Sequence, residues 1–286
     1  MPNEERDANP PAAAESECST PASELRVTSD FDFDRIVAET FVRKVEFHQT
    51  LGSTNDRGLE LTERPDCECP VVVLAESQTQ GRGRGENQWW SAEGSLTFSL
   101  VVDCDRFSLT PENRPKASLT VGLAMCETLS ELLSDVHIGL KWPNDVFLNG
   151  RKTCGILIET RAAPANRLVI GVGLNVNNSL SAAPDAIREI ATSLIDVAGQ
   201  SFALPDVLIR LIGQIELNLH RLSVPRDDLR TRWRRFCVLR GQTVILDVNN
   251  RQVVGECQGV DRDGALLLKT GSGTKRFFSG IIAGIM

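Results

Sequence analysis

Histidine is scarce in this chain, and paired metal-binding cysteines are missing. The 286 residues contain three histidines, and none of the eight cysteines forms a CxxC pair. Structural zinc sites need such ligands in pairs at short spacing, so the sequence excludes that class of protein. No apolar run approaches the roughly 18 residues that a membrane-spanning helix requires. The first residues carry acidic side chains where a signal peptide needs positive charge, which predicts a cytoplasmic protein.

An excess of positive charge is also missing. The formal net charge is -7 and the sequence pI is about 5.2. Broad binding to nucleic acid depends on clustered lysine and arginine that displace counterions, so this balance argues against it. Several cysteines, such as Cys126 and Cys154, stand inside apolar runs. The sequence therefore predicts buried, reduced thiols and not a disulfide framework.

Residues 1–28 and the rest of the chain differ in composition. The first segment is rich in Pro, Ala, Ser and Glu and predicts a disordered tail. Too few periodic apolar residues precede Phe31 to predict a winged-helix domain there. Beyond the tail, helical spacing alternates with β-type runs, and Asn149-Gly150 is a strong hairpin signal. The predicted helices are 54–64, 116–135, 204–222 and 226–237, and the predicted strands are 71–75, 96–102, 137–142, 145–148, 154–159 and 168–176.

This order of elements predicts an α+β fold over residues 29–238, with a mixed β-sheet and flanking helices, and not repeated βαβ units. The residue pattern changes after Arg240. Short β-type segments separated by Asn249-Asn250, Asp263-Gly264 and a Gly-Ser-Gly turn predict a small β-barrel over residues 239–286. Its predicted strands are 243–248, 252–260, 265–270 and 275–278.

Two segments combine cations with special backbone residues. Gly81-Arg82-Gly83-Arg84-Gly85 has three glycines in five residues, which allows close approach to a ligand, and two arginines suited to carboxylate or phosphate. It is neither a P-loop nor a dinucleotide fingerprint, and a solvated loop is an equal alternative. Lys141-Trp142-Pro143-Asn144-Asp145 places a lysine at a strand end beside a bulky aromatic. Such a lysine can stabilise developing negative charge, while a snorkelling surface lysine is the alternative.

Three further segments are ambiguous when taken one at a time. Lys152 to Glu159 contains an apolar core strand with Lys152 and Gly155 as candidate ligand contacts. Gly171 to Asn177 alternates apolar residues with small or polar ones, as in a strand that lines a pocket or in an edge strand. Ser53-Thr54-Asn55 taken alone is an ordinary helix N-cap.

Taken together and in this order, the motifs resemble those of biotin–protein ligases. The succession is Ser53-Thr54-Asn55, GRGRG followed by Trp89, KWPND, KTCGILIE and GVGLNVN, and then GALLLK near the chain end. The resemblance covers about residues 45–286. It implies a catalytic domain of the class II synthetase type. It also implies activation of biotin with Mg-ATP to biotinyl-5'-adenylate, and transfer of biotin to a lysine of a biotin carboxyl-carrier domain.

The resemblance also implies site residues. Lys141 and Arg84 would be catalytic. The biotin contacts would be Ser53, Thr54, Asn55, Gln78, Gly81, Arg82, Arg84, Lys141 and Gly155. The ATP and adenylate contacts would be Arg82, Arg84, Trp89, Lys141, Asn144, Lys152 and Asn175, with Asp145 as a magnesium contact.

One departure concerns the loop. Gly85 and Glu86 stand where family members usually carry a further basic residue and glycine, so the loop has only two cations. The DNA-binding domain of bifunctional ligase–repressors has no counterpart before Phe31, so DNA binding is not expected. Membrane association is not expected either, because no apolar run is long enough to span a membrane. A homodimer is compatible with the resemblance. The rival functions are a lipoate–protein ligase or octanoyltransferase, and a non-catalytic biotin or nucleotide sensor.

Overall fold

The computed structural model describes residues 31–161, 166–224 and 228–286, and the predicted tail lies outside them. A seven-stranded sheet forms the larger part of the molecule, with strand order β1-β2-β3-β7-β6-β5-β4. β1 and β2 are parallel and the other neighbours are antiparallel, so the mixed sheet is confirmed. The strands are β1 Lys44–Leu51, β2 Val71–Gln78, β3 Leu96–Asp103, β4 Ile138–Lys141, β5 Asp145–Leu148, β6 Arg151–Glu159 and β7 Arg167–Leu174.

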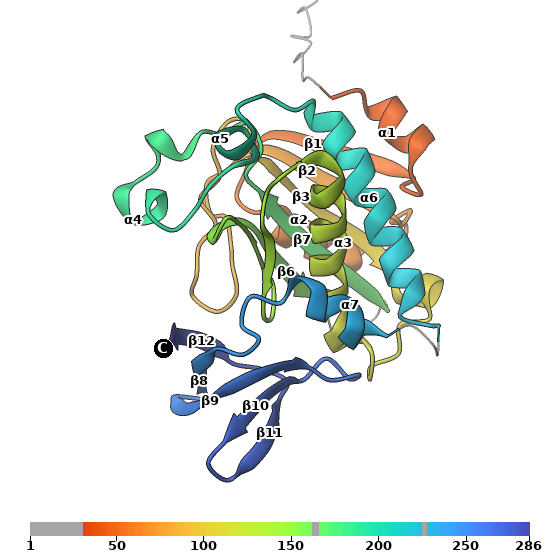
Figure 1. Cartoon of the computed structure of the whole chain (residues 1–286). Helices are drawn as coiled ribbons and strands as arrows, with labels where there is room; N and C mark the ends of the chain where they lie inside the picture. The colour runs from red at the N-terminus through yellow and green to blue at the C-terminus, as the bar shows by residue number, and fades with distance from the viewer. Residues whose placement is uncertain (1–30, 162–165, 225–227) are drawn as a thin grey trace, which may run out of the picture.

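Helices cover both faces of this sheet (Figure 1). α3 and α6 pack together on one face, and α2 packs on the other, against β2, β3 and β7. α3 is buried on nearly every side because it lies between the sheet and α6. The helices are α1 Phe33–Glu39, α2 Thr54–Thr62, α3 Ala117–Leu132, α4 Asp185–Arg188, α5 Leu194–Ala198, α6 Leu204–Arg221 and α7 Leu229–Phe236, with short 3-10 turns at Cys104–Phe107, Arg114–Lys116 and Leu180–Ala182.

Most predicted elements of the larger unit are present. Asn149 and Gly150 join β5 to β6 with φ of 48° and 80°, the positive values that a tight hairpin turn requires. The prediction missed α1 and β1. α1 has only seven residues, and β1 is half-buried with charged residues among the apolar ones, so neither gives a clear period. None of the described helices is long and apolar enough to cross a membrane.

The predicted C-terminal barrel is wrong. The five strands form an open antiparallel sheet in the order β11-β10-β9-β8-β12, with β11 and β12 as its two edges. Its apolar face does not need to close on itself, because Val244, Leu246 and Leu268 join the same core cluster as Trp233 and Leu140 of the larger unit. The strands are β8 Thr243–Val248, β9 Arg251–Val260, β10 Leu266–Thr270, β11 Gly273–Phe277 and β12 Ile281–Ile285.

The seven cysteines among the described residues are free thiols, as predicted. Cys126 and Cys154 are fully buried in the core, and burial raises the pKa of both thiols. A thiol with a raised pKa stays protonated at neutral pH and is a poor nucleophile. These two cysteines therefore act as small apolar side chains.

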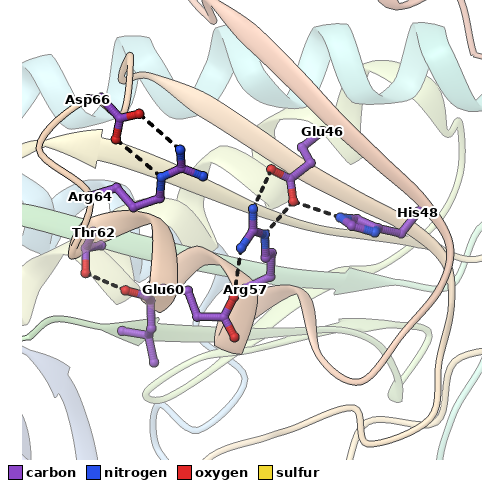
Figure 2. A network of polar contacts seen from close by, with 8 residues as sticks. Glu46, His48, Arg57, Glu60, Thr62, Arg64 and Asp66 are labelled. Carbon is purple, nitrogen blue, oxygen red and sulfur yellow. Dashed lines mark hydrogen bonds and ion pairs between the residues drawn. The ribbon is translucent and has the colours of Figure 1, made fainter.

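Helix α2 is tied to the edge strand β1 by a half-buried ion pair (Figure 2). Arg57 Nε lies 2.5 Å from Glu46 Oε1, and Arg57 also donates to Glu60. His48 Nε2 lies 2.8 Å from the same Glu46 oxygen. The hydrogen bond from Arg57 lowers the pKa of Glu46, although burial of the carboxyl opposes this. This network fixes the helix whose first residues are Thr54 and Asn55.

Glu46→Gln is therefore expected to lower the free energy of unfolding by about 1–2 kcal/mol at pH 7. Because the pKa of Glu46 is lowered in the folded protein, its ionised carboxylate stabilises the fold at pH values above the ordinary pKa of 4.5. This stabilisation is lost as the pH falls below that value. The difference between wild type and variant should therefore shrink towards pH 3, as measured by urea unfolding across a pH series. Glu39→Gln, which removes an exposed ion pair with Arg35, is the control and should change little. A difference that is constant with pH would contradict the assignment.

Candidate active site

One large pocket opens where the seven-stranded sheet meets the C-terminal sheet. Its walls come from the start of α2, the segment after β2, the β4–β5 turn, β6, β7 and the start of β12. The lining residues are Ser53, Thr54, Asn55, Gln78, Arg82, Gly83, Arg84, Asn87, Gln88, Trp89, Thr97, Lys141, Trp142, Pro143, Asn144, Asp145, Lys152, Gly155, Ile156, Leu157, Gly171, Val172, Gly173, Gly280, Ile281 and Ile282. The pocket thus brings together the motifs that the sequence spreads over more than 100 residues.

One part of the wall is neutral and polar. Thr54 donates its backbone N–H to Gln78 Oε1 at 2.6 Å, and its hydroxyl lies 3.1 Å from the same oxygen. Ser53 occupies the N-cap position of α2, but its side chain makes no cap hydrogen bond. Because Gln78 satisfies the first N–H of the helix, the hydroxyl of Ser53 is left for a ligand. The simple N-cap interpretation of this serine does not hold.

Asn55 belongs to the same polar wall and is almost fully saturated by protein partners. Its Nδ2 donates to Leu157 O at 3.2 Å and to Glu159 Oε2 at 2.9 Å, while Ser99 Oγ lies 2.6 Å from Oδ1. A Cβ on Gly171 would lie only 2.0 Å from Asn55 Oδ1. The glycine of β7 is therefore required so that the amide can lie against the strand.

A second part of the wall is cationic. Lys152 Nζ pairs with Asp145 Oδ1 at 2.6 Å. Lys141 pairs in register with Asp145 across the β4–β5 hairpin, yet it forms no ion pair with any carboxylate of the described residues. An ammonium group without a protein counter-ion in a pocket wall is suited to an anionic ligand.

The loop from Gly81 to Trp89 adds two more cations. Its ends are held by the bond from Trp89 N to Gly81 O, 2.9 Å, and Gly83 N donates to Asn87 O at 2.7 Å. Arg84 crosses to the C-terminal sheet, where its guanidinium donates to Gly280 O at 2.7 Å. Burial lowers the pKa of Arg84, while Asp145 acts in the opposite direction; a guanidinium nevertheless stays charged at neutral pH.

Trp89 places an aromatic ring between these two parts of the wall. A Cβ on Gly173 would lie 2.3 Å from Trp89 Cε2, and one on Gly155 would lie 3.4 Å from Cζ3. The two strand glycines therefore leave the space that the indole ring occupies. Trp89 Nε1 is buried and has no hydrogen-bond partner among the described residues.

The KWPND segment has a partly structural role. Trp142 is 3% exposed, and its indole N–H donates to Gly264 O of the C-terminal unit at 3.4 Å. Asn144 donates its side-chain N–H to Ile156 O at 2.6 Å. Both residues line the pocket, and both also fix the β4–β5 turn so that Lys141 and Asp145 hold their positions.

Two predicted contacts lie outside the lining. Gly81 is packed behind it, where a Cβ would lie 2.5 Å from Trp89 O. Asn175 is buried and uses its side chain internally: Nδ2 donates to Thr192 O at 3.1 Å, and Oδ1 accepts from Asn178 at 3.0 Å. Asn175 therefore supports the end of β7 from behind, and the glycines Gly171 and Gly173 are the residues of this strand that meet the pocket.

Several pocket residues were not predicted from the sequence. Thr97 on β3 lines the wall, as do Gly280 and the first two residues of β12, Ile281 and Ile282, a strand that no sequence pattern indicated. Asp56 and Glu159 both pair with Arg82 of the loop. Thr97, Glu159 and the β12 residues are brought to the site by contacts over long sequence distances, which local patterns do not report.

No group of three or more His, Cys, Asp or Glu suited to a metal ion occurs within the described ranges. Asp145, the predicted magnesium contact, is instead paired with Lys152. A magnesium ion that enters with a nucleotide takes most of its ligands from phosphate and water. A single carboxylate such as Asp145 is compatible with that role.

The arrangement defines a class of site. A neutral wall rich in hydrogen-bonding groups and an indole ring adjoin a cluster of cations. The pocket is suited to a ligand with an uncharged polar group and a carboxylate, held next to phosphate.

Comparison with known proteins agrees with this class. Residues 48–175 match the model of the biotin/lipoate A/B protein ligase family, and residues 240–283 match the biotin protein ligase C-terminal domain. The bifunctional ligase/repressor BirA of Bacillus subtilis is 30% identical over 237 residues, covering 82% of this chain and 71% of the relative. The biotin–[acetyl-CoA-carboxylase] ligase of Mycobacterium tuberculosis is 33% identical, over 71% of this chain and 75% of the relative.

A solved structure gives the same result. The biotin protein ligase from Aquifex aeolicus in complex with biotin and ATP superposes with a TM-score of 0.72 at 28% identity, covering 83% of this chain and 97% of that one. The chain belongs to the biotin protein ligase family.

Proposed function

We propose that this protein activates biotin with ATP to biotinyl-5'-adenylate and transfers the biotinyl group to a lysine of a biotin carboxyl-carrier domain. The observation that carries the proposal is the neutral polar wall of Ser53 to Asn55 and Gln78 in one pocket with Arg84, Lys141 and Lys152. The uncharged ureido group of biotin suits the first part. The carboxylate of biotin and the phosphates of ATP suit the second.

The first step is attack of the biotin carboxylate oxygen on the α-phosphorus of Mg-ATP. A new P–O bond forms, the bond to the β-phosphate oxygen breaks, and pyrophosphate leaves. Lys141 is placed to stabilise charge that develops on the α-phosphate, because it lines the pocket and has no counter-ion among the described residues. Lys152 is held by Asp145 at 2.6 Å and would bind the nucleotide beside it.

The second step is attack of the acceptor lysine amine on the acyl carbon of the mixed anhydride. The C–O bond to AMP breaks, the amine loses a proton, and AMP leaves as a phosphate monoester. Until then the anhydride must be kept from water. The loop from Gly81 to Trp89 and the start of β12 form the walls that would cover it. A cytoplasmic location is part of the proposal, since the free thiols of this chain suit a reducing compartment.

The test is biotin-dependent exchange of labelled pyrophosphate into ATP, followed by transfer of labelled biotin to a purified carrier domain. Lipoate and octanoate are assayed side by side with biotin. Exchange with biotin alone, and ATP-dependent transfer, are expected. Exchange with lipoate instead would favour a lipoate ligase, and binding of biotin without exchange would favour a sensor.

Arg84→Gly is expected to release the adenylate faster than wild type does. The change removes the bond to Gly280 O and one of the two loop cations, so the wall over the intermediate loses its link to the C-terminal sheet. Released adenylate acylates lysines without enzyme control, so an unrelated protein present during turnover should be biotinylated several-fold more. Arg262→Gly, at a side chain that is 92% exposed, is the control. Equal labelling by wild type and Arg84→Gly would contradict the role of Arg84.

A further inference from the structure

Glu159, the last residue of β6, joins two parts of the pocket that are distant in the sequence. Its Oε2 accepts a hydrogen bond from Asn55 Nδ2 at 2.9 Å. The same oxygen pairs with the guanidinium of Arg82. Asn55 belongs to the neutral polar wall, and Arg82 belongs to the base of the loop that would cover the adenylate. A single carboxylate oxygen therefore connects α2, β6 and the loop.

The contact with Glu159 fixes the orientation of the Asn55 amide. A carboxylate only accepts hydrogen bonds, so the NH₂ group of Asn55 must face Glu159 and Leu157 O, and Oδ1 must face Ser99. Both N–H bonds of the amide are then used. A ligand can reach only the remaining acceptor capacity of Oδ1. Without the carboxylate of Glu159, the amide would keep Leu157 O as one acceptor but lose the charged acceptor of its second N–H.

The contact with Arg82 fixes the base of the loop. Arg82 Nε lies 3.0 Å from Asp56 Oδ1, in the first turn of α2, while Nη2 of the same guanidinium meets Glu159 Oε2. Two carboxylates from different elements thus hold one arginine in a forked geometry. Arg82 also forms a backbone bridge with Gln88 on the returning side of the loop. The base is anchored on the biotin side of the pocket, and Arg84 is anchored on the C-terminal sheet.

We propose that Glu159 is a positioning residue that couples recognition of biotin to the placement of the loop. This inference rests on the proposed function. Glu159 acts through Asn55 and Arg82, so it should affect biotin binding and adenylate retention. The chemistry at phosphorus, assigned to Lys141, should be nearly unaffected.

The first test measures pyrophosphate exchange by the full chain with Glu159→Gln. The KM for biotin should rise about tenfold, while the KM for ATP and kcat stay within about threefold of wild type. Glu63→Gln makes the same chemical change in an exposed ion pair with Arg161 and should alter neither constant. A biotin KM within twofold of wild type, or a loss confined to kcat, would overturn the proposal.

The second test is a double-mutant cycle on the rate at which bound biotinyl-adenylate leaves the enzyme. Glu159→Gln and Arg82→Ala should each speed release several-fold, and the double variant should release no faster than the faster single one. Independent, multiplicative effects would show that the two residues do not act together.

A third variant keeps the proposal falsifiable if Glu159→Gln fails to fold. Asp56→Asn removes the other carboxylate of Arg82 without touching Asn55. It should speed adenylate release while leaving the biotin KM within twofold of wild type, and a raised biotin KM would contradict the division of roles. Absence of biotin-dependent exchange in the wild type would refute the proposed function itself. Normal wild-type exchange with an unaffected Glu159→Gln would refute only the role of Glu159.

Discussion

Replacing Lys141 with alanine is expected to lower kcat for adenylate formation by about 10²–10³ while the fold stays intact. The side chain stands at the end of β4, lines the pocket and has no ion-pair partner among the described residues, so its charge serves the ligand and not packing. Interactions that strengthen as negative charge develops on the phosphate lower the barrier and not merely the KM. The measurement is the single-turnover rate of adenylate formation at saturating biotin and ATP.

Lys275→Ala is the matched control for this variant. Lys275 lies exposed on β11, outside the pocket lining, so its loss should leave the rate unchanged. Circular dichroism and the melting temperature of both variants should match wild type. A Lys141→Ala enzyme with near wild-type turnover would remove Lys141 from the mechanism.

Gly171→Ala is expected to raise the Kd for biotin by on the order of 100-fold. The added Cβ would lie 2.0 Å from Asn55 Oδ1 and 3.0 Å from its Nδ2, so the amide must leave the strand. Its bonds to Leu157, Glu159 and Ser99 would be lost together, at about 1–3 kcal/mol for each buried group left without a partner. Biotin titration by calorimetry measures the effect.

Gly213→Ala is the control for the glycine substitution. No atom lies within 4 Å of a Cβ at Gly213, and the residue is inside α6, where alanine favours the helix. This variant should bind biotin like wild type. Equal affinities of Gly171→Ala and wild type would show that the amide of Asn55 is not part of the biotin site.

Much of the larger unit could be predicted because its signals are local. The helical spacing of residues 116–135 found α3, and the positive-φ pair Asn149-Gly150 found the β5–β6 hairpin. Lys141 ends β4 and Lys152 lies near the start of β6, and Asp145 of β5 meets both, Lys141 by strand register and Lys152 by an ion pair, so the two lysines reach one pocket. The positions of both lysines follow from the registers of the short β4–β5 and β5–β6 hairpins, which the local sequence determines.

What could not be predicted depends on contacts between distant segments. The five C-terminal strands leave an open sheet because α7 and the larger core cover their apolar face, which the strand pattern alone cannot report. Asn175 was predicted to contact the ligand, but its side chain instead forms hydrogen bonds with Thr192 O and with the side chain of Asn178. From the sequence, Glu159 was predicted to be only the end of a core strand. Its partners Asn55 and Arg82 are 104 and 77 residues away in the sequence, so no local pattern links them.

The shared core between the two sheets limits how ligands can enter and leave. Swinging the C-terminal sheet aside would bring Val244, Leu246 and Leu268 into water, at roughly 25 cal/mol for each Å² of apolar surface. Moving the part of the loop between Gly81 and Trp89 breaks polar contacts instead, those of Arg82 with its two carboxylates and of Arg84 with Gly280 O. Passage of biotin inward and of the adenylate outward should therefore follow the loop, with the sheet as a stationary wall.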